Sequence, residues 1–515
     1  MKQEEETDLV FDMDDEEGGA KSGGEEKRDD GSESDKAMSE RHLSELLADE
    51  PYGTSWPRTF RETSLTISNS FRSTSLLKTA SNLGLESTLT LPLMSATVDH
   101  LPKGFSFASD VWKHSFPELE KPQKCSYAQS VFNGINVMCG VGLLSTPYAI
   151  KEGGWLGLSI LFAFSLIAWY TGILLKRCLD STPGLQTYPD IAEAAFGNVG
   201  RMALSILLYL ELYAASVEFV ILMGENLSSV FPNVHLAFLG THLNSLQFFS
   251  VLATLAVLPT TWLRNLSFMS YLSAGGVVAS LLVVACLLWV GLVDQIGFHA
   301  SGTALDIANL PVALGLYGFC YAGHPLFPNI YLSMENPRDF PSVLLLSFVV
   351  CTVLYSGVAV TGFLMFGNAI ESQFTLNLPN RLVASKIAVW TTVVNPLTKY
   401  ALTITPVAMS LEELLPVHCA KSLGIAFFMR TVLVATTLGV ALTFPFFGFV
   451  MALIGSFITM IIALICPCAS YLRLMRGRLS KIQVSVCCFI ILIGIVCSSV
   501  GTYSSIMKIA DNMHP

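Results

Sequence analysis

The sequence predicts an all-α polytopic membrane protein with two five-helix halves and an eleventh helix, and three observations support this. The chain has 515 residues and a mean hydropathy of +0.55, and only 14% of its residues are charged, whereas soluble proteins carry about a quarter. Eleven apolar runs follow residue 120, each near the ~20 residues that a helix needs to cross a bilayer. Closely spaced glycines and a proline interrupt the first and the sixth run.

The first 120 residues differ in composition from the rest of the chain. Residues 1–50 contain 19 acidic and 6 basic side chains, so this stretch alone is more negative than the whole chain, whose net charge is −10. Ser and Thr are frequent over residues 64–97. Such a composition buries too little apolar surface to offset the entropy of ordering. We therefore predict a disordered, acidic and Ser-rich cytosolic tail over residues 1–120.

The membrane domain is predicted over residues 121–508. Residues 126–293 form the first repeat, residues 308–471 the second and residues 482–505 the extra helix, while residues 509–515 form a short lumenal tail. The individual spans are expected near 126–149, 155–178, 201–225, 245–264, 267–293, 308–332, 341–366, 383–407, 424–445, 447–471 and 482–505. Between the second and third spans, a short interfacial helix should begin at Pro189, because proline suits the first helical turn.

The distribution of Lys and Arg in the short loops predicts a cytosolic N-terminus. With this orientation, nine basic side chains flank the spans on the cytosolic side and four on the other, which follows the positive-inside rule. The odd number of spans places the C-terminus in the lumen. Asn226-Leu-Ser falls on the lumenal side and matches the N-glycosylation sequence.

The two interrupted spans predict a binding site in the middle of the membrane. The first reads Asn133-Gly-Ile-Asn-Val-Met-Cys-Gly-Val-Gly-Leu-Leu-Ser-Thr-Pro147, and the sixth reads Gly315-Leu-Tyr-Gly-Phe-Cys-Tyr-Ala-Gly-His-Pro325. A broken helix exposes N–H groups at one half-helix start and carbonyls at the other half-helix end, so a zwitterion fits both. Corresponding breaks in two five-helix halves are typical of an inverted-repeat transporter. The alternative is close helix packing through small residues.

Four segments resemble the amino acid/auxin permease family, and in particular its vacuolar members in plants and fungi, which are related to the vesicular inhibitory amino acid transporter. They are Gly140-Val-Gly-Leu-Leu-Ser-Thr-Pro147, Thr187-Tyr-Pro-Asp-Ile-Ala-Glu-Ala-Ala-Phe-Gly197, Gly323-His-Pro-Leu-Phe-Pro-Asn-Ile-Tyr331 and Asn395-Pro-Leu-Thr-Lys-Tyr400.

The resemblance implies a LeuT-like core. It also implies that backbone amides near residues 139–143 bind the carboxylate of an amino acid and that carbonyls near residues 318–321 bind its ammonium group. The candidate substrate-binding residues are Asn136, Cys139, Gly140, Val141, Gly142, Leu143, Gly318, Phe319, Cys320 and Tyr321.

Ionisable groups inside the spans are candidates for ion coupling, because each costs at least ~2.5–3.5 kcal/mol at the bilayer centre. Glu211 and Glu218 lie one above the other on the third span, and carboxylates buried among apolar groups favour the protonated form. His324 follows the second break, and Lys399 on the eighth span could take the place of a sodium ion. The alternative is that neighbouring Thr398 binds sodium. The resemblance to vacuolar members favours protons, with the vacuolar proton gradient driving antiport.

The sequence therefore predicts a secondary carrier of amino acids in the vacuolar membrane, working as a monomer in the lipid bilayer. No nucleotide-binding loop, metal cluster or Ser-His-Asp arrangement indicates an enzyme, a cofactor or a nucleic-acid partner, and most of the twelve cysteines lie within apolar runs. Two alternatives use the same scaffold: an amino acid sensor, and a sodium-coupled carrier in the plasma membrane. A channel is disfavoured because polar residues gather at two breaks and do not line several helices.

Overall fold

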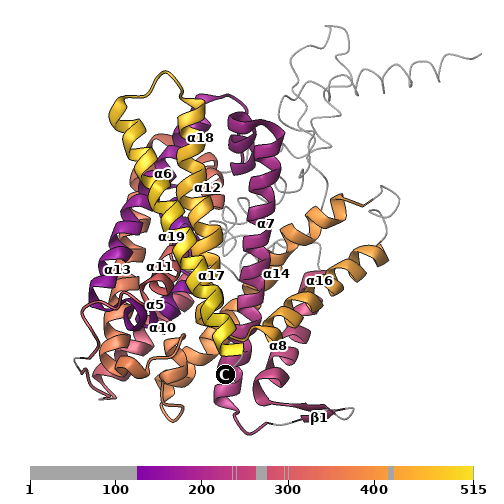
Figure 1. Ribbon diagram of the computed structural model, residues 1–515. Coiled ribbons are helices and arrows are strands. Elements are labelled where there is room, and N and C mark those ends of the chain that lie inside the picture. The colour runs from indigo at the N-terminus through magenta and orange to yellow at the C-terminus, as the bar shows by residue number, and fades with distance from the viewer. Residues whose placement is uncertain are drawn as a thin grey trace, which may run out of the picture. The chain divides into compact units, whose positions relative to one another are not determined.

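The computed structural model describes residues 124–513 except 235, 239–240, 263–274, 295, 300 and 416–422, so the predicted tail over 1–120 lies outside the described residues. The described residues form a bundle of helices (Figure 1). Its α-helices are α4 (Tyr127–Met138), α5 (Gly142–Gly153), α6 (Leu158–Ser181), α7 (Tyr188–Val230), α8 (Ser245–Trp262), α10 (Gly276–Leu292), α11 (Leu310–Phe319), α12 (Phe327–Ser333), α13 (Phe340–Phe366), α14 (Val383–Glu413), α16 (Leu423–Thr443), α17 (Phe447–Ile454), α18 (Cys466–Leu474) and α19 (Lys481–Met513).

The remaining elements are short. Two π-helical segments, η7 (Gly455–Thr459) and η8 (Ile461–Ile465), join α17 to α18. Strands β1 (Leu236–Phe238) and β2 (Thr241–Leu243) form an antiparallel hairpin that the sequence did not predict. Five 3₁₀ turns connect the longer helices: η2 (Trp155–Gly157), η3 (His324–Leu326), η4 (Pro337–Asp339), η5 (Gly367–Ala369) and η6 (Phe374–Asn377).

Each of the eleven predicted spans coincides with one described helix or with a pair of helices separated by an irregular segment. Among the described residues, seven helical stretches are long and apolar enough to cross a membrane. The first and sixth spans are each split into two helices, the fifth is represented by the 17-residue α10, and the eighth is the 31-residue α14, which carries polar side chains. The predicted all-α polytopic fold is confirmed.

Local sequence signals set several helix boundaries. The side chain of Ser126 accepts a hydrogen bond from the backbone of Gln129, and Gln129 returns one, which is a capping box at the start of α4. Thr187 and Asp190 make the same arrangement at the start of α7. The predicted interfacial helix therefore begins at Tyr188, one residue before the predicted start. It continues into the third span across a kink at Gly197, whose φ of 71° suits glycine.

The helices pack in two sets. In one set, α13 packs against α4, α5 and α6, and α11 packs against α5. In the other set, α7 packs against α8, α14 and α16, and α10 packs against α14. The last two spans, α17 with α18 and α19, pack along α11 and α6. The first and sixth spans thus lie in one set and face the second set across the bundle interior.

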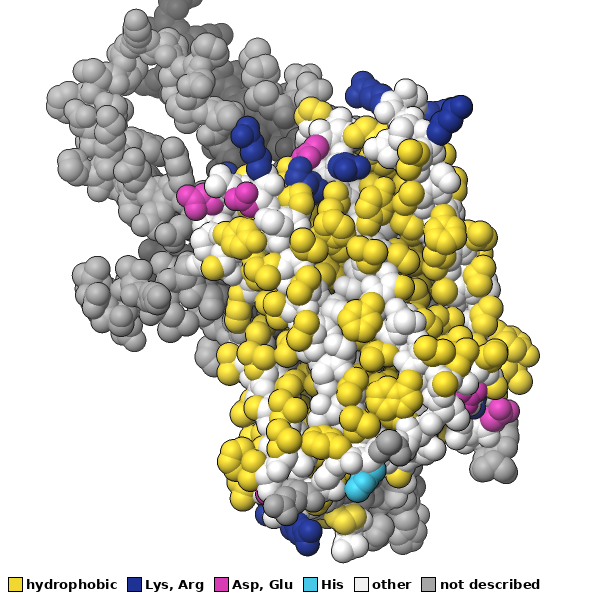
Figure 2. Space-filling view, turned by 90° about the vertical axis from the view of Figure 1, so that its left-hand side faces the viewer, with side chains coloured by type: hydrophobic (Ala, Val, Ile, Leu, Met, Phe, Trp, Pro, Cys, Tyr) yellow, Lys and Arg dark blue, Asp and Glu magenta, His cyan; other side chains and the backbone are white. Residues whose placement is uncertain are grey.

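The outer surface of the bundle matches a bilayer. Figure 2 shows hydrophobic side chains across the middle of one face, with Lys, Arg, Asp and Glu gathered toward the two ends. Large apolar side chains on outward-facing positions are well exposed, among them Leu166, Val353 and Phe489. A contiguous apolar surface of this kind needs an apolar medium to cover it. The lipid bilayer predicted from composition is therefore a partner of this surface.

The C-terminal helix is longer than predicted. The sequence places the eleventh span at 482–505 and a short tail at 509–515, whereas α19 is helical from Lys481 to Met513. Polar residues near the end, such as Asp511 and Asn512, do not stop a helix that has left the apolar layer, because helices continue in water when no breaker follows. The described part of the expected tail is helical.

Candidate substrate-binding site

The first predicted break is present. Helix α4 ends at Met138, residues 139–141 have irregular backbone, and α5 begins at Gly142. Short-range bonds form the first turn, in which the Leu143 N–H donates to the Gly140 carbonyl at 3.2 Å and the Leu144 N–H to the Val141 carbonyl at 3.0 Å. The start of a helix carries N–H groups with no intrahelical acceptor, and the helix dipole favours an anion there. The first turn of α5 is therefore a candidate seat for a carboxylate.

The second predicted break is also present. Helix α11 ends at Phe319, a 3₁₀ turn covers His324–Leu326, and α12 begins at Phe327. The carbonyls of Gly318 and Phe319 accept turn bonds from the N–H groups of Tyr321 and Ala322, at 3.2 and 3.1 Å. These carbonyls are therefore already engaged in the turn, although each keeps a second lone pair.

A cavity of about 310 Å³ lies beside both breaks, which is within the usual size range of small-molecule sites. It lies between the two helix sets, with α4, α5 and the sixth span on one side and α7, α10 and α14 on the other. The residues that line the cavity extend from the breaks toward the predicted cytosolic end of the bundle. Helix α7 begins and α14 ends at this end (top of Figure 1). Its polar lining residues are Asn136, Glu211, Glu218, Ser280, Thr391, Thr392, Asn395, Lys399 and Thr403.

Both carboxylates predicted on the third span line this cavity, but their surroundings differ. The Thr459 hydroxyl donates to Glu211 Oε1 at 3.0 Å. Glu218 is fully buried, and neither of its carboxylate oxygens has a hydrogen-bond partner among the described residues. A buried ionised carboxylate without a partner is costly. Of the two, Glu218 is the group that most needs a proton or a positively charged ligand.

Lys399 reaches the cavity from α14, which packs against α7 on the same side of the cavity. A Cβ atom placed on Gly276 would lie 2.9 Å from Lys399 Nζ and 3.0 Å from Asn136 Oδ1, so both polar atoms converge where Gly276 leaves room. Asn136 is buried, and its Oδ1 has no hydrogen-bond partner among the described residues. No ion pair of Lys399 is found in the described part of the chain. The cavity therefore contains a cation and two carboxylates that do not neutralise one another by direct contact.

The predicted site residues divide between lining and packing positions. Those that line the cavity are Asn136, Gly140, Val141, Gly142, Leu143, Phe319, Glu211, Glu218 and Lys399. The remaining candidates, which are not among the lining residues, are Cys139, Gly318, Cys320, Tyr321, His324 and Thr398.

Each of these six has another contact that explains its position. Cys320 packs against Gly142, and Gly318 lies against Met460 and Gly455. The hydroxyl of Tyr321 is 2.8 Å from that of Thr352.

The remaining three also bond elsewhere. His324 Nε2 lies 2.9 Å from the Thr171 hydroxyl, and the Thr398 hydroxyl donates to the Asn395 carbonyl at 2.8 Å. Cys139 is fully buried at the break, and its backbone N–H donates to the Ile135 carbonyl at 2.6 Å. Thr398 is thus bonded to its own helix and is not placed as a ligand of the cavity.

The sequence prediction missed several polar lining residues. The missed residues Thr391, Asn395 and Thr403 recur with the predicted Lys399 every fourth residue along α14 and line the cavity. Residues spaced by four share one helix face, so this periodicity was available in the sequence. Ser280 on α10 also lines the cavity, but a lone serine in an apolar run gives no such signal.

The opposite end of the bundle is closed by polar contacts. Gln373 donates to Glu225 and accepts from Asn226 Nδ2, both at 2.5 Å, and the Thr375 hydroxyl donates to Asn226 Oδ1 at 2.9 Å. Lys151 on α5 donates to the Ile370 carbonyl at 3.0 Å. The segment after α13 is thus tied to both helix sets. Asn226 is fully buried, so the matching sequence Asn226-Leu-Ser leaves no room for a glycan on this side chain in the folded protein.

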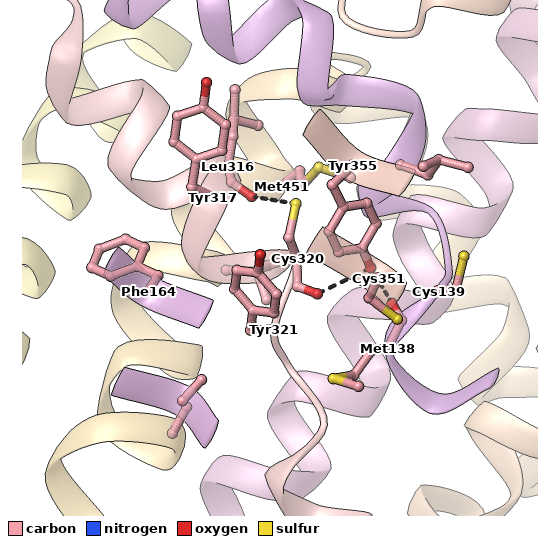
Figure 3. Close-up of a cluster of buried hydrophobic side chains, with 14 of the residues drawn as sticks. Met138, Cys139, Phe164, Leu316, Tyr317, Cys320, Tyr321, Cys351, Tyr355 and Met451 are labelled. Carbon is pink, nitrogen blue, oxygen red and sulfur yellow. Dashed lines mark hydrogen bonds between the residues drawn. The ribbon is translucent and has the colours of Figure 1, made fainter. Parts of the chain in front are cut away.

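A buried cluster joins the two breaks behind the cavity (Figure 3). The Tyr355 hydroxyl on α13 contacts the Met138 carbonyl at the first break and the Cys320 carbonyl at the second. Among the described residues, no group of three or more His, Cys, Asp or Glu side chains is arranged to hold a metal ion. The chemistry that this arrangement supports is reversible binding of a small polar molecule, with charged side chains on one side of the cavity and the two helix breaks on the other.

The chain is similar to a family of known membrane proteins and to several of their named members. The family described as "Transmembrane amino acid transporter protein" matches residues 123–507. "Amino acid transporter AVT1B" of Arabidopsis thaliana is 51% identical over 513 residues, covering 94% of each chain. The "Vesicular inhibitory amino acid transporter" of Xenopus laevis is 26% identical over 421 residues, covering 75% of this chain and 77% of its own. A solved Na⁺-coupled sialic acid symporter is similar at 11% identity and a TM-score of 0.43, covering 74% of this chain and 89% of that chain.

Proposed function

Because this chain belongs to the transmembrane amino acid transporter protein family, we propose that it is a secondary carrier that moves amino acids across the vacuolar membrane by proton-coupled alternating access. The expectation of a transporter and not an enzyme is confirmed by the family. The observation that carries the rest is the cavity of about 310 Å³ beside two broken helices. Glu218 and Lys399 both line this cavity, and no ion pair joins them among the described residues.

The substrate's carboxylate binds at the start of α5. Gly140, Val141, Gly142 and Leu143 all line the cavity, and the first N–H groups of a helix favour an anion through hydrogen bonds and the helix dipole. Lys399 adds a positive charge to the same cavity. A free amino acid brings both a carboxylate and an ammonium group, so it can satisfy both the donors and the acceptors that line the cavity.

The ammonium group binds near Asn136 and Glu218. Asn136 Oδ1 and the two Glu218 oxygens are buried acceptors without a partner among the described residues. This places the ammonium on side chains, in contrast to the predicted seat on carbonyls of residues 318–321, because the carbonyls of Gly318 and Phe319 accept turn bonds. A second lone pair on the Phe319 carbonyl remains a further acceptor.

Proton coupling is assigned to Glu218, with Glu211 as its neighbour on the same helix face. A proton neutralises the Glu218 carboxylate when no ammonium group is near, so proton and substrate occupancy exclude each other at this position. This is the behaviour that an antiporter needs. The ammonium group of Lys399 lies between α14 and the first span, where a sodium-coupled carrier would bind a sodium ion. Lys399 thus provides a permanent positive charge in place of that ion. We therefore favour protons over the sodium alternative.

Alternating access follows from the two helix sets. The first set contains α4, α5, α6, α11, α12 and α13, and the second contains α7, α8, α14 and α16. The cavity lies between them, and the polar contacts of Gln373 with Glu225 and Asn226 close its far end. Rocking the first set on the second would break these contacts and close the predicted cytosolic end. One chain supplies every part of this machinery, so we propose a monomer.

The test uses purified protein in proteoliposomes with an imposed pH difference. Each of the twenty amino acids is offered in radiolabelled form, first with a pH difference, then with a sodium gradient, then with neither. We expect concentrative flux of at least one amino acid under the pH difference alone. Flux that requires sodium would refute proton coupling. Saturable binding of an amino acid without any flux would favour the sensor alternative. A fluorescent fusion in intact cells, compared with markers of the vacuolar and plasma membranes, tests the location.

A further inference from the structure

Tyr355 lies where the two broken helices come closest behind the cavity. It belongs to the middle of α13, and its side chain is fully buried. Its hydroxyl oxygen lies 2.5 Å from the Met138 carbonyl oxygen and 3.1 Å from the Cys320 carbonyl oxygen (Figure 3). One side chain from a continuous helix thus contacts the backbone of both breaks.

The two carbonyls are the ones that the breaks set free. Met138 is the last residue of α4, and Cys320 follows the last residue of α11, so the regular bond to an N–H four residues later is interrupted at both. In the membrane interior, a backbone carbonyl without a donor is costly, and irregular backbone is tolerated only where protein groups satisfy it. Tyr355 is the side chain that supplies a donor to this pair.

A hydroxyl carries only one hydrogen. Tyr355 can therefore donate fully to one carbonyl at a time, or share its hydrogen between both. Two carbonyls from unwound helices that converge on one point are otherwise the kind of group that holds a coupling cation. With the hydroxyl in that position, no cation is needed there to hold the breaks together.

The surroundings fix the position of this hydroxyl. The rings of Tyr355 and Tyr321 meet edge to face with centroids 5.8 Å apart. One and two turns earlier on α13, Cys351 lies 4.0 Å from the Ile135 carbonyl and Ser347 donates to the Val131 carbonyl at 3.2 Å. Helix α13 therefore follows α4 closely up to the break, and the Tyr355 ring has little freedom to move.

We propose that Tyr355 is a positioning residue that ties the two breaks together through its hydroxyl and so sets the shape of the amino acid site without touching the substrate. This inference rests on the proposed function. Loss of the hydroxyl would leave both carbonyls free to turn and would let the first turn of α5 shift relative to α11. The expected consequence is weaker substrate binding, with little change in the rate at which bound substrate crosses.

The matched control is Tyr317, which lies on α11 less than one turn before the second break. It is fully buried in the same cluster, but its hydroxyl has no hydrogen-bond partner among the described residues. Tyr355→Phe and Tyr317→Phe each remove one buried hydroxyl and change nothing else. In the proteoliposome assay, Tyr355→Phe should raise KM about tenfold or more and leave kcat within about twofold, whereas Tyr317→Phe should leave KM unchanged.

The outcomes separate this inference from the proposed function. Absence of amino acid flux in the wild-type protein would overturn the proposed function. It would also remove the basis for a role of Tyr355 in an amino acid site. Wild-type flux together with an unchanged KM in Tyr355→Phe would overturn only the role of Tyr355. If Tyr355→Phe does not fold, 3-fluorotyrosine at position 355 keeps the ring and makes the hydroxyl a stronger donor. This replacement should change KM when it is made at position 355 and leave KM unchanged when it is made at position 317. Equal KM values for the two variants would also overturn the inference.

Discussion

Replacing Glu218 with Gln removes an ionisable carboxyl from the cavity and keeps the shape of the side chain. Glu218 is 0% exposed, and both of its oxygens lack a hydrogen-bond partner among the described residues. A neutral amide is therefore no harder to bury there than the carboxylate, so the folded protein should lose no stability. The variant loses the ability to bind and release a proton at this position.

The expected change in substrate accumulation follows from the transport of one proton per cycle. We assign one proton because, of the two glutamates that line the cavity, only Glu218 lacks a hydrogen-bond donor among the described residues. A pH difference of one unit is worth about 1.36 kcal/mol per proton, which corresponds to about a tenfold concentration ratio of substrate. The wild-type protein should thus concentrate its substrate about tenfold at a pH difference of one unit. Glu218→Gln should equilibrate the substrate and stop near a ratio of one.

The assay measures radiolabelled substrate and, in parallel, proton flux with a pH-sensitive dye inside the proteoliposomes. Exchange of labelled for unlabelled substrate without a gradient should persist in Glu218→Gln, with a higher KM because the ammonium group loses its charged partner, and this exchange shows that the protein is folded and binds. Glu225→Gln serves for comparison, because Glu225 lies on the same helix seven residues later and outside the cavity; this variant should alter the contact with Gln373 at the far end and still accumulate substrate with proton movement. Tenfold accumulation with proton movement in Glu218→Gln would refute the coupling role.

Three further variants probe packing and the site. Gly455→Ala would place its Cβ 2.0 Å from a carbonyl oxygen of α11, so thermal unfolding should show a loss of about 1–3 kcal/mol; an unchanged melting temperature would contradict this contact. Arg430→Met breaks a buried pair with Glu412, at 2.8 Å, and should cost about 3–5 kcal/mol. Adding Glu412→Gln should recover much of that loss, and a double variant as unstable as the single one would argue against the pair. Gly142→Ala would place a Cβ 3.3 Å from Cys320 at the second break, whereas the Cβ of Gly140→Ala meets nothing closer than 3.9 Å. Gly142→Ala should therefore raise KM more than Gly140→Ala, and equal KM values would contradict the tight packing at the start of α5.

The breaks could be predicted because their causes are local. Glycines cost helix stability and proline removes a backbone donor, and both signals stand in the sequence at residues 140–147 and 315–325. The spacing of Glu211 and Glu218 by seven residues likewise predicts a shared helix face, and both line the cavity. Patterns within one helix are sufficient for such features.

The tie through Tyr355 and the orientation of the second break could not be predicted in this way. A tyrosine in an apolar helix normally indicates core packing, and its hydroxyl partners lie 217 and 35 residues away. The carbonyls of residues 318 and 319 point into turn bonds that depend on the detailed course of the backbone after α11. Both features depend on how the helices meet in three dimensions.

Helix ends were predicted less well for a different reason. Hydropathy marks where a helix enters and leaves the apolar layer, and not where it ends. Helix α7 therefore begins at Tyr188, well before the predicted span at 201–225, and α19 continues to Met513. Capping residues such as Thr187 give the better boundary signal.

The central idea is that the two interrupted helices bind a free amino acid between them. A cryo-EM map of the wild-type protein, prepared with the amino acid that the uptake screen identifies, tests it most directly. We predict density in the cavity with the substrate carboxylate within hydrogen-bonding distance of the backbone amides of residues 140–142 and the ammonium beside Asn136 and Glu218. Substrate density elsewhere in the bundle, with these amides and side chains bonded only to protein, would contradict the account.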